Sequence, residues 1–164
     1  MKSGNKRDGS RMSLSKSGYI KAVAVHMKTS LGRPMENAEE IVRQVKQYEA
    51  KNPDLIVFGE LSISGYSCGD LFLQSFIEEQ CRMAITYLCD NLPQSDTLIA
   101  VGAPLRKDGM LFNTALIFKG NELLGIVPKT FVPNYKEFYE KRWFAGADQR
   151  FSDTIRYDEI FYDE

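Results

Sequence analysis

The sequence is poor in the residues that most often carry metal-dependent and nucleophilic chemistry. It has one histidine, His26, so a Ser-His-Asp triad or a histidine-rich zinc site would depend on that residue alone, and we expect neither. The three cysteines, Cys68, Cys81 and Cys89, form no closely spaced metal-binding pair and no even disulfide framework. Because no secretory signal sequence stands at the start either, this pattern favours a reducing, cytoplasmic setting.

Long apolar runs and an excess of one charge are also missing. No stretch approaches the ~20 apolar residues that span a bilayer, so we expect no membrane as a partner. The formal net charge is -1, and no stripe of Lys and Arg stands out to neutralise phosphates, so we expect no nucleic acid either. The 164 residues, 43% hydrophobic and 26% charged, are typical of one soluble globular domain.

Polar and basic residues fill positions 1–17, which we predict to be a disordered leader. Strands are predicted over residues 19–26, 54–60, 97–104, 111–118 and 122–129, and helices over 34–52 and 73–92. This β-α-β-α-β-β-β order predicts an open α/β sheet with helices packed on a face. The second helix is expected to bury Phe76, Ile77, Cys81, Ile85, Leu88 and Cys89, so its cysteines are interpreted as core residues rather than ligands or nucleophiles.

Glu60 and Lys129 each stand at the end of a predicted strand. Glu60 follows the apolar run 55–58, and Lys129 follows the run 123–127 and a proline. Catalytic groups collect at the carboxyl ends of strands in such sheets, and a partly desolvated carboxylate suits a general base. A lysine beside it would pair with the carboxylate and could stabilise an oxyanion. Each residue singly also fits a solvated strand end, but two strand ends can present both side chains to one pocket.

The segment after Lys129, TFVPNYKEFYEKRWF, predicts an ordered loop that leads into a short helix. Two pairs of opposite charge stand four residues apart, Lys136 with Glu140 and Glu137 with Lys141. Ion pairs on a helix surface are therefore one explanation of the pattern. That explanation accounts less well for the aromatic residues around Glu140, which are Phe138, Tyr139, Trp143 and Phe144.

Three segments together resemble a known family: FGELSISGYSCGDLF at 58–72, VGAPLRKDGMLFNTALIF at 101–118 and PKTFVPNYKEFYEKRWF at 128–144. From about Tyr19 onwards the chain resembles the nitrilase superfamily of carbon–nitrogen hydrolases. It is most similar to the N-terminal glutaminase domain of glutamine-dependent NAD synthetases. The resemblance implies an α/β fold of the nitrilase type, an α-β-β-α sandwich, of which residues 18–164 would form the N-terminal part.

The resemblance also implies a Glu-Lys-Cys triad that hydrolyses glutamine through a thioester and releases glutamate and ammonia. By matching motifs, Glu60 resembles the general base, Lys129 the residue that stabilises the oxyanion, and Glu140 the second glutamate, which orients the lysine. The positions that match contacts to the glutamine substrate are Tyr66, Tyr135 and, along the wall of the same pocket, Phe138.

Other parts that the resemblance implies are missing from the sequence. The nucleophilic cysteine of the family lies on a later strand, so we expect the chain to end before it and to be inactive alone. In the family, ammonia passes to a downstream synthetase domain, a ligase that uses ATP and Mg²⁺ to amidate nicotinic acid adenine dinucleotide to NAD. No phosphate loop of that domain occurs here, so we expect no cofactor in this segment. A homo-oligomer is expected by resemblance only.

Two alternatives stay open. The chain could belong to another amidase or carbamoylase of the superfamily that acts without a partner domain, although Tyr66 and Tyr135 favour glutamine. It could also belong to a non-catalytic member that serves as an assembly module. Because the strands that would complete the sandwich are expected to be missing, we expect an exposed sheet edge and low stability in isolation.

Overall fold

The computed structural model describes residues 18–161, and the predicted leader over residues 1–17 lies outside them, as do residues 162–164. The strands are β1 (Ala22–Val25), β2 (Leu55–Phe58), β3 (Leu98–Lys107), β4 (Met110–Lys119) and β5 (Glu122–Pro128). The helices are α1 (Pro34–Glu49), α2 (Ser75–Asn91) and the single turn α3 (Tyr157–Ile160). Three 3-10 segments complete the described part: η2 (Tyr66–Leu73), η3 (Glu140–Arg142) and η4 (Ala147–Gln149). The predicted order of strands and helices is confirmed.

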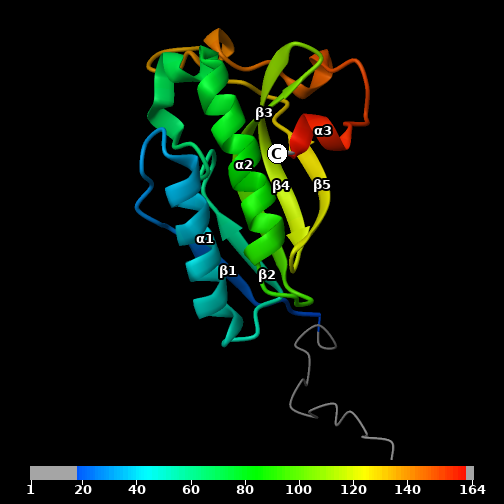
Figure 1. Ribbon diagram of the computed structural model, residues 1–164. Helices are drawn as coiled ribbons and strands as arrows, with labels where there is room; N and C mark the ends of the chain where they lie inside the picture. Colours follow the sequence, from blue (N-terminus) through cyan, green and yellow to red (C-terminus); the bar gives the residue numbers. More distant parts are fainter. Residues whose placement is uncertain (1–17, 162–164) are drawn as a thin grey trace, which may run out of the picture.

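The five strands form one mixed sheet in the order β1-β2-β3-β4-β5. β1, β2 and β3 run parallel, whereas β4 is antiparallel to both β3 and β5. The carboxyl ends of β2, β3 and β5 therefore share one edge of the sheet, the upper edge in Figure 1. The segments that follow these strands are thus brought together at that edge, although they lie far apart in the sequence.

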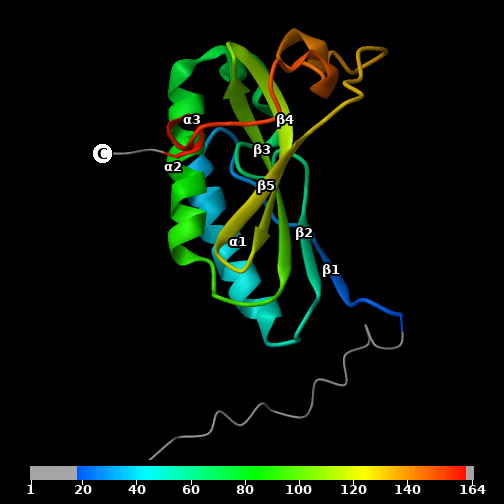
Figure 2. The same ribbon diagram turned by 90° about the vertical axis from the view of Figure 1, so that its right-hand side faces the viewer.

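α1 and α2 cover one face of the sheet (Figure 2). Pro34 occupies the first turn of α1, where its missing N–H is not needed, and a helical stripe behind it is buried against the strands. The buried stripes are Ala38, Ile41, Val42 and Val45 in α1, and Ile77, Cys81, Ala84, Ile85 and Leu88 in α2. The expectation for Phe76 was wrong, because its side chain is 64% exposed at the first turn of α2, and Cys89 is only half-buried.

The opposite face of the sheet carries no helix or strand from the described residues (Figure 2). Large apolar side chains are exposed on the strands, namely Val57, Leu98, Leu124 and Val127. Strands that read as continuous apolar runs are typical of sheets covered on both faces, and here α1 and α2 cover one. No helix in this part of the chain is both long and apolar enough to cross a membrane.

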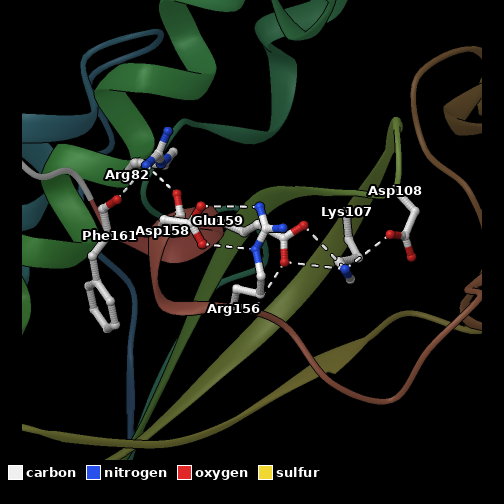
Figure 3. A network of polar contacts seen from close by, with 7 residues as sticks. All are labelled: Arg82, Lys107, Asp108, Arg156, Asp158, Glu159 and Phe161. Carbon is white, nitrogen blue, oxygen red and sulfur yellow. Dashed lines mark hydrogen bonds and ion pairs between the residues drawn. The ribbon is translucent and has the colours of Figure 1, made fainter.

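Hydrogen bonds and ion pairs hold the last described segment, which contains α3, against α2 and the end of β3 (Figure 3). Lys107, at the end of β3, lies 3.2 Å from the Glu159 carboxylate of α3. Arg82 of α2 donates hydrogen bonds to the carbonyl oxygens of Asp158 and Phe161. These contacts hold α3 against the face of the sheet that α1 and α2 cover, on the side away from the exposed apolar residues.

Candidate active site

Four side chains from four separate segments meet at the carboxyl edge of the sheet. Lys129 Nζ lies 2.7 Å from Glu60 Oε1 and 2.9 Å from Glu140 Oε2. The Tyr66 hydroxyl donates a 2.6 Å hydrogen bond to the other oxygen of Glu140. We call Glu60, Lys129, Glu140 and Tyr66 the polar cluster. The pairing of Glu60 with Lys129 that the strand ends predict is present, whereas the chemical roles of these residues stay predictions.

The segment that carries Glu60 lies directly on β3, and Gly102 makes this approach possible. A Cβ atom at Gly102 would lie 2.3 Å from the backbone nitrogen of Leu61 and 2.7 Å from the carbonyl oxygen of Gly59. The contact is held by hydrogen bonds, because Ile63 N–H donates to Gly102 O at 3.0 Å and Gly102 N–H donates to Ser62 Oγ at 3.2 Å. Only glycine fits at this position of β3.

Leu61 turns the chain sharply just after Glu60. Its φ of 49° is in the left-handed region, which a bulky residue rarely adopts, and its side chain is fully buried. Such a backbone persists only where surrounding packing holds it, and it is common at functional sites. Here a second small core supplies that packing, with buried side chains from Leu61, Cys68, Phe72, Leu111, Val132 and Phe144.

Lys129 is held by its backbone as well as by its ammonium group. Its N–H donates to the carbonyl oxygen of Asn113 in β4 at 2.8 Å, and its own carbonyl accepts from Ala147 N–H at 2.9 Å. Burial lowers the pKa of Lys129, but the hydrogen bonds and negative charges of Glu60 and Glu140 outweigh burial and raise it. The lysine therefore stays a cation between two carboxylates.

Glu140 is the buried acid of the cluster, with 5% of its side chain exposed, compared with 43% for Glu60. Glu60 is therefore partly desolvated, and Glu140 is the more deeply buried of the two carboxylates. Burial, followed by the hydrogen bond to Glu140 and the charges of Glu140 and Glu60, raises the pKa of Tyr66. The Tyr66 hydroxyl thus remains protonated and able to donate.

The helical ion pairs considered for residues 136–141 do not form among the described residues. Lys136 has a φ of 52°, which breaks any α-helix there, and only the 3-10 turn η3 follows. Without an α-helical repeat, residues four apart do not face each other. Glu140 instead reaches back to Lys129, and its N–H donates to Pro133 O at 3.1 Å.

A second link joins η2 and η3, the segments that carry Tyr66 and Glu140. Arg142 donates from Nε and Nη2 to the two oxygens of Asp70, at 2.7 and 2.8 Å, and Trp143 Nε1 donates to Asp70 Oδ1 at 2.9 Å. The hydrogen bonds from Arg142 and Trp143 lower the pKa of Asp70 well below its usual range. No pattern in the sequence predicts this link.

Asn113 of β4 is a further site residue that the sequence patterns did not reveal. It is buried, and its side-chain Nδ2 donates to Glu60 Oε1 at 2.5 Å. The one signal in the sequence was an amide side chain inside the otherwise apolar run LFNTALIF, because a buried polar group needs a partner.

Tyr135 and Phe138 lie beside each other on the segment that follows β5, with ring centroids 6.2 Å apart. Their exposed fractions are 65% and 37%. In the described part of the chain, neither donates or accepts a side-chain hydrogen bond with the polar cluster. Their predicted contact with substrate is neither supported nor excluded by this placement.

A hollow of about 360 Å³ opens beside the cluster on the uncovered face of the sheet. Glu60 and Lys129 line it together with apolar and small residues, among them Val57, Ala100, Ala115 and Val127. A mostly apolar hollow with a few charged groups at one end is the usual setting for binding a small polar molecule.

None of the three cysteines, all within the described residues, makes a hydrogen bond to the polar cluster. The Cys68 thiol donates to Ser64 O at 3.0 Å, and burial raises its pKa. Burial also raises the pKa of Cys81, and that of Cys89 to about 11. These thiols are therefore protonated at neutral pH and poor nucleophiles. Within the same residues, no three His, Cys, Asp or Glu side chains gather into a group that could hold a metal ion.

Comparison with known proteins gives concordant results. The family model for the carbon–nitrogen hydrolases matches residues 22–151. The glutamine-dependent NAD(+) synthetase of Mycobacterium bovis is 35% identical over 135 residues, which cover 80% of this chain and 19% of that protein. The chain thus spans about a fifth of the length of the curated relatives it matches.

Solved structures agree on the fold. A glutamine-dependent NAD(+) synthetase from Cytophaga hutchinsonii superposes with a TM-score of 0.74 at 25% identity, covering 87% of this chain and 24% of that one. The NitN amidase of Nesterenkonia sp. AN1 superposes with a TM-score of 0.67 at 16% identity, covering 80% of this chain and 51% of the amidase. The second likeness concerns the fold alone.

Proposed function

The chain belongs to the carbon–nitrogen hydrolase family, and on that premise we propose that it forms the N-terminal part of the glutaminase domain of a glutamine-dependent NAD synthetase. The observation that carries the proposal is the ion-paired cluster of Glu60, Lys129 and Glu140 at the shared carboxyl edge of the sheet. Relatives at 35% identity that are glutamine-dependent NAD(+) synthetases support glutamine as the substrate.

In the proposed reaction, Glu60 accepts the thiol proton of a cysteine supplied from outside these 164 residues. The thiolate attacks the side-chain amide carbon of glutamine, and the carbonyl oxygen becomes an oxyanion. The Lys129 ammonium, kept charged by its raised pKa, lies 2.7 Å from Glu60 and is placed to stabilise that oxyanion. Protonated Glu60 then returns its proton to the leaving nitrogen, and ammonia departs from a thioester.

Water completes the cycle in this proposal. Glu60 takes a proton from the water that attacks the thioester, and glutamate and the free thiol are formed. Glu140 keeps Lys129 in place throughout, because one of its oxygens binds the ammonium and the other is occupied by the Tyr66 hydroxyl.

The complete protein, in this proposal, passes the ammonia to a synthetase domain that uses ATP and Mg²⁺ to amidate nicotinic acid adenine dinucleotide. That step needs groups outside these residues, and we assign none of its contacts here. We also propose that the complete protein is a cytoplasmic homo-oligomer. The 164 residues alone should not hydrolyse glutamine. Cys68 and Cys81 are buried in cores, Cys89 is half-buried, and among the described residues none of the three bonds to the polar cluster.

The proposal is tested in the full-length protein that contains these residues, by measuring NAD formation from glutamine and, separately, from added ammonia. Glu60→Gln should lower the glutamine-driven rate by about 10²- to 10⁴-fold, the usual contribution of a general base, and leave the ammonia-driven rate unchanged. Glu122→Gln, at the exposed start of β5, is the matched control and should alter neither rate.

Three outcomes would contradict the proposal. Retention of the glutamine-driven rate in Glu60→Gln would remove the general base. Loss of both rates in a folded variant would show a role outside glutamine hydrolysis. A wild-type protein that hydrolyses a different amide and not glutamine would place the chain in an amidase or carbamoylase of the same family.

A further inference from the structure

Asn113 is bonded to both charged partners of the proposed reaction. Its side-chain Nδ2 donates to Glu60 Oε1 at 2.5 Å, and its backbone carbonyl accepts the Lys129 N–H at 2.8 Å. The residue lies inside β4, which is hydrogen-bonded to β3 and to β5, and its side chain is buried. Asn113 is therefore held in place by the sheet and contacts both the segment that carries Glu60 and the segment that carries Lys129.

The hydrogen bonds to Glu60 are distributed unequally between its two oxygens. Oε1 accepts from both Lys129 Nζ and Asn113 Nδ2. Within the part of the chain that the structure describes, Oε2 accepts no hydrogen bond. With two donors on one oxygen, rotation of the carboxylate about its last bond would break both contacts, so the two oxygens cannot exchange places freely.

We propose that Asn113 is a positioning residue that fixes the Glu60 carboxylate, so that Oε2 is the oxygen that receives the proton. This inference rests on the proposed function, because it assigns the atom through which Glu60 acts as a base. A neutral amide suits the task, since it donates a hydrogen bond without adding a charge that would compete with Lys129. An aspartate at the same place would set a second carboxylate against Glu60.

A general base acts only when its proton-accepting atom lies within hydrogen-bond reach of the reacting group, and displacement by about 1 Å costs about 10²-fold in rate. Among the described residues, loss of Asn113 Nδ2 leaves Lys129 as the single donor to Glu60 Oε1. One flexible ammonium does not fix the plane of a carboxylate. The expected defect is therefore in turnover rather than in substrate binding.

The test compares Asn113→Ala with Thr97→Val in the full-length protein, using the steady-state kinetics of glutamine hydrolysis. Thr97 is the matched control, because it is likewise a buried polar residue whose side chain donates a hydrogen bond. Its acceptor is the backbone carbonyl of Pro53, next to the opposite edge of the sheet. Asn113→Ala should lower kcat by about 10- to 100-fold and change KM by less than about threefold. Thr97→Val should leave kcat within about twofold of wild type, and ammonia-driven synthesis should survive in both.

Other outcomes separate this inference from the proposed function. If Asn113→Ala keeps its kcat while Glu60→Gln loses it, the positioning role is wrong and the proposed function stands. Equal losses in Asn113→Ala and Thr97→Val would reduce the effect to general destabilisation and overturn the inference. If the wild-type protein does not hydrolyse glutamine, the proposed function fails first. In that case, crystal structures of the wild-type protein and of Asn113→Ala test the positioning role. An unchanged orientation of the Glu60 carboxylate in Asn113→Ala would overturn the inference.

Discussion

The close contact between Gly102 and the Glu60 segment makes Gly102→Ala the most informative single change. A methyl group at this position would lie 2.3 Å from Leu61 N, 2.7 Å from Gly59 O and 2.9 Å from the carbonyl carbon of Glu60. Ordinary contact begins at 3.4 Å, so the closest pair is more than 1 Å too near. All three neighbours are backbone atoms, so no side-chain rotation can relieve the overlap.

The backbone on either side of Glu60 must therefore move away from β3 by about 1 Å. Overpacking of this kind costs about 1–3 kcal/mol in the free energy of unfolding. The same shift would also carry the Glu60 carboxylate away from Lys129 and Asn113, and a misplacement of about 1 Å costs about 10²-fold in rate. We expect Gly102→Ala to lose both stability and glutamine hydrolysis, with the greater loss in hydrolysis.

Denaturant unfolding and glutamine hydrolysis of the full-length protein measure the two effects. Gly125→Ala in β5 is the matched control, because a Cβ there would meet nothing within 4 Å. That variant should keep its activity and change the free energy of unfolding by about 1 kcal/mol or less. A Gly102→Ala protein with wild-type stability and wild-type activity would refute the steric argument.

Three further changes test the polar cluster and its supports. Tyr66→Phe leaves one oxygen of the buried Glu140 without its donor, which should cost about 1–3 kcal/mol in unfolding experiments and lower glutamine turnover about tenfold. Lys129 has a raised pKa, so its contribution to stability is fully present below its unfolded pKa of about 10.4 and is lost as the pH rises through the higher folded value. The free energies of unfolding of wild type and Lys129→Met should therefore converge as the pH rises through that range. Asp70 has a lowered pKa, so the stability from its pairing with Arg142 is present above about pH 3.9 and is lost as the pH falls through the lower folded value. The Tm values of Asp70→Asn and wild type should therefore differ near neutral pH and converge in acid.

The parts of the fold that follow from local patterns could be predicted from the sequence. Apolar runs between turn residues gave the strands and their order, and Pro34 marked the first turn of α1. The meeting of Glu60 and Lys129 agrees with the prediction made from their strand ends. β2 and β5 are nevertheless separated by β3 and β4, and the two side chains meet because the Glu60 segment lies across β3 at Gly102. The predicted strand over residues 97–104 stopped at Pro104, before the polar residues Arg106 and Lys107. The pairing in fact continues to Lys107 and Met110 around an Asp-Gly turn.

The supports of the site could not be predicted, because they join segments far apart in the chain. Asn113 lies 53 residues from Glu60, and Arg142 lies 72 residues from Asp70. Nothing local distinguishes Asp70 and Arg142 from solvated polar residues, and for Asn113 the one local signal is its place in an apolar run. The closeness of Gly102 to the Glu60 segment is likewise visible only in three dimensions, since a glycine within a strand is compatible with several explanations.

The two carboxylates of the cluster differ in a way that separates their tasks without reference to any relative. Glu140 is 5% exposed, and each of its oxygens is engaged, one by Tyr66 and one by Lys129. Glu60 is 43% exposed, and both of its donors lie on the same oxygen. A carboxylate with both oxygens occupied and little access to solvent can orient a cation but has no site to accept a proton. Glu60 lines the hollow, and its second oxygen accepts no hydrogen bond within the described residues. Such a carboxylate is oriented and still able to react. If the assignment is right, Glu140→Gln should retain more activity than Glu60→Gln, because an amide at position 140 can still accept from Lys129, whereas an amide at position 60 cannot take up a proton. Comparable losses in the two folded variants would refute this division.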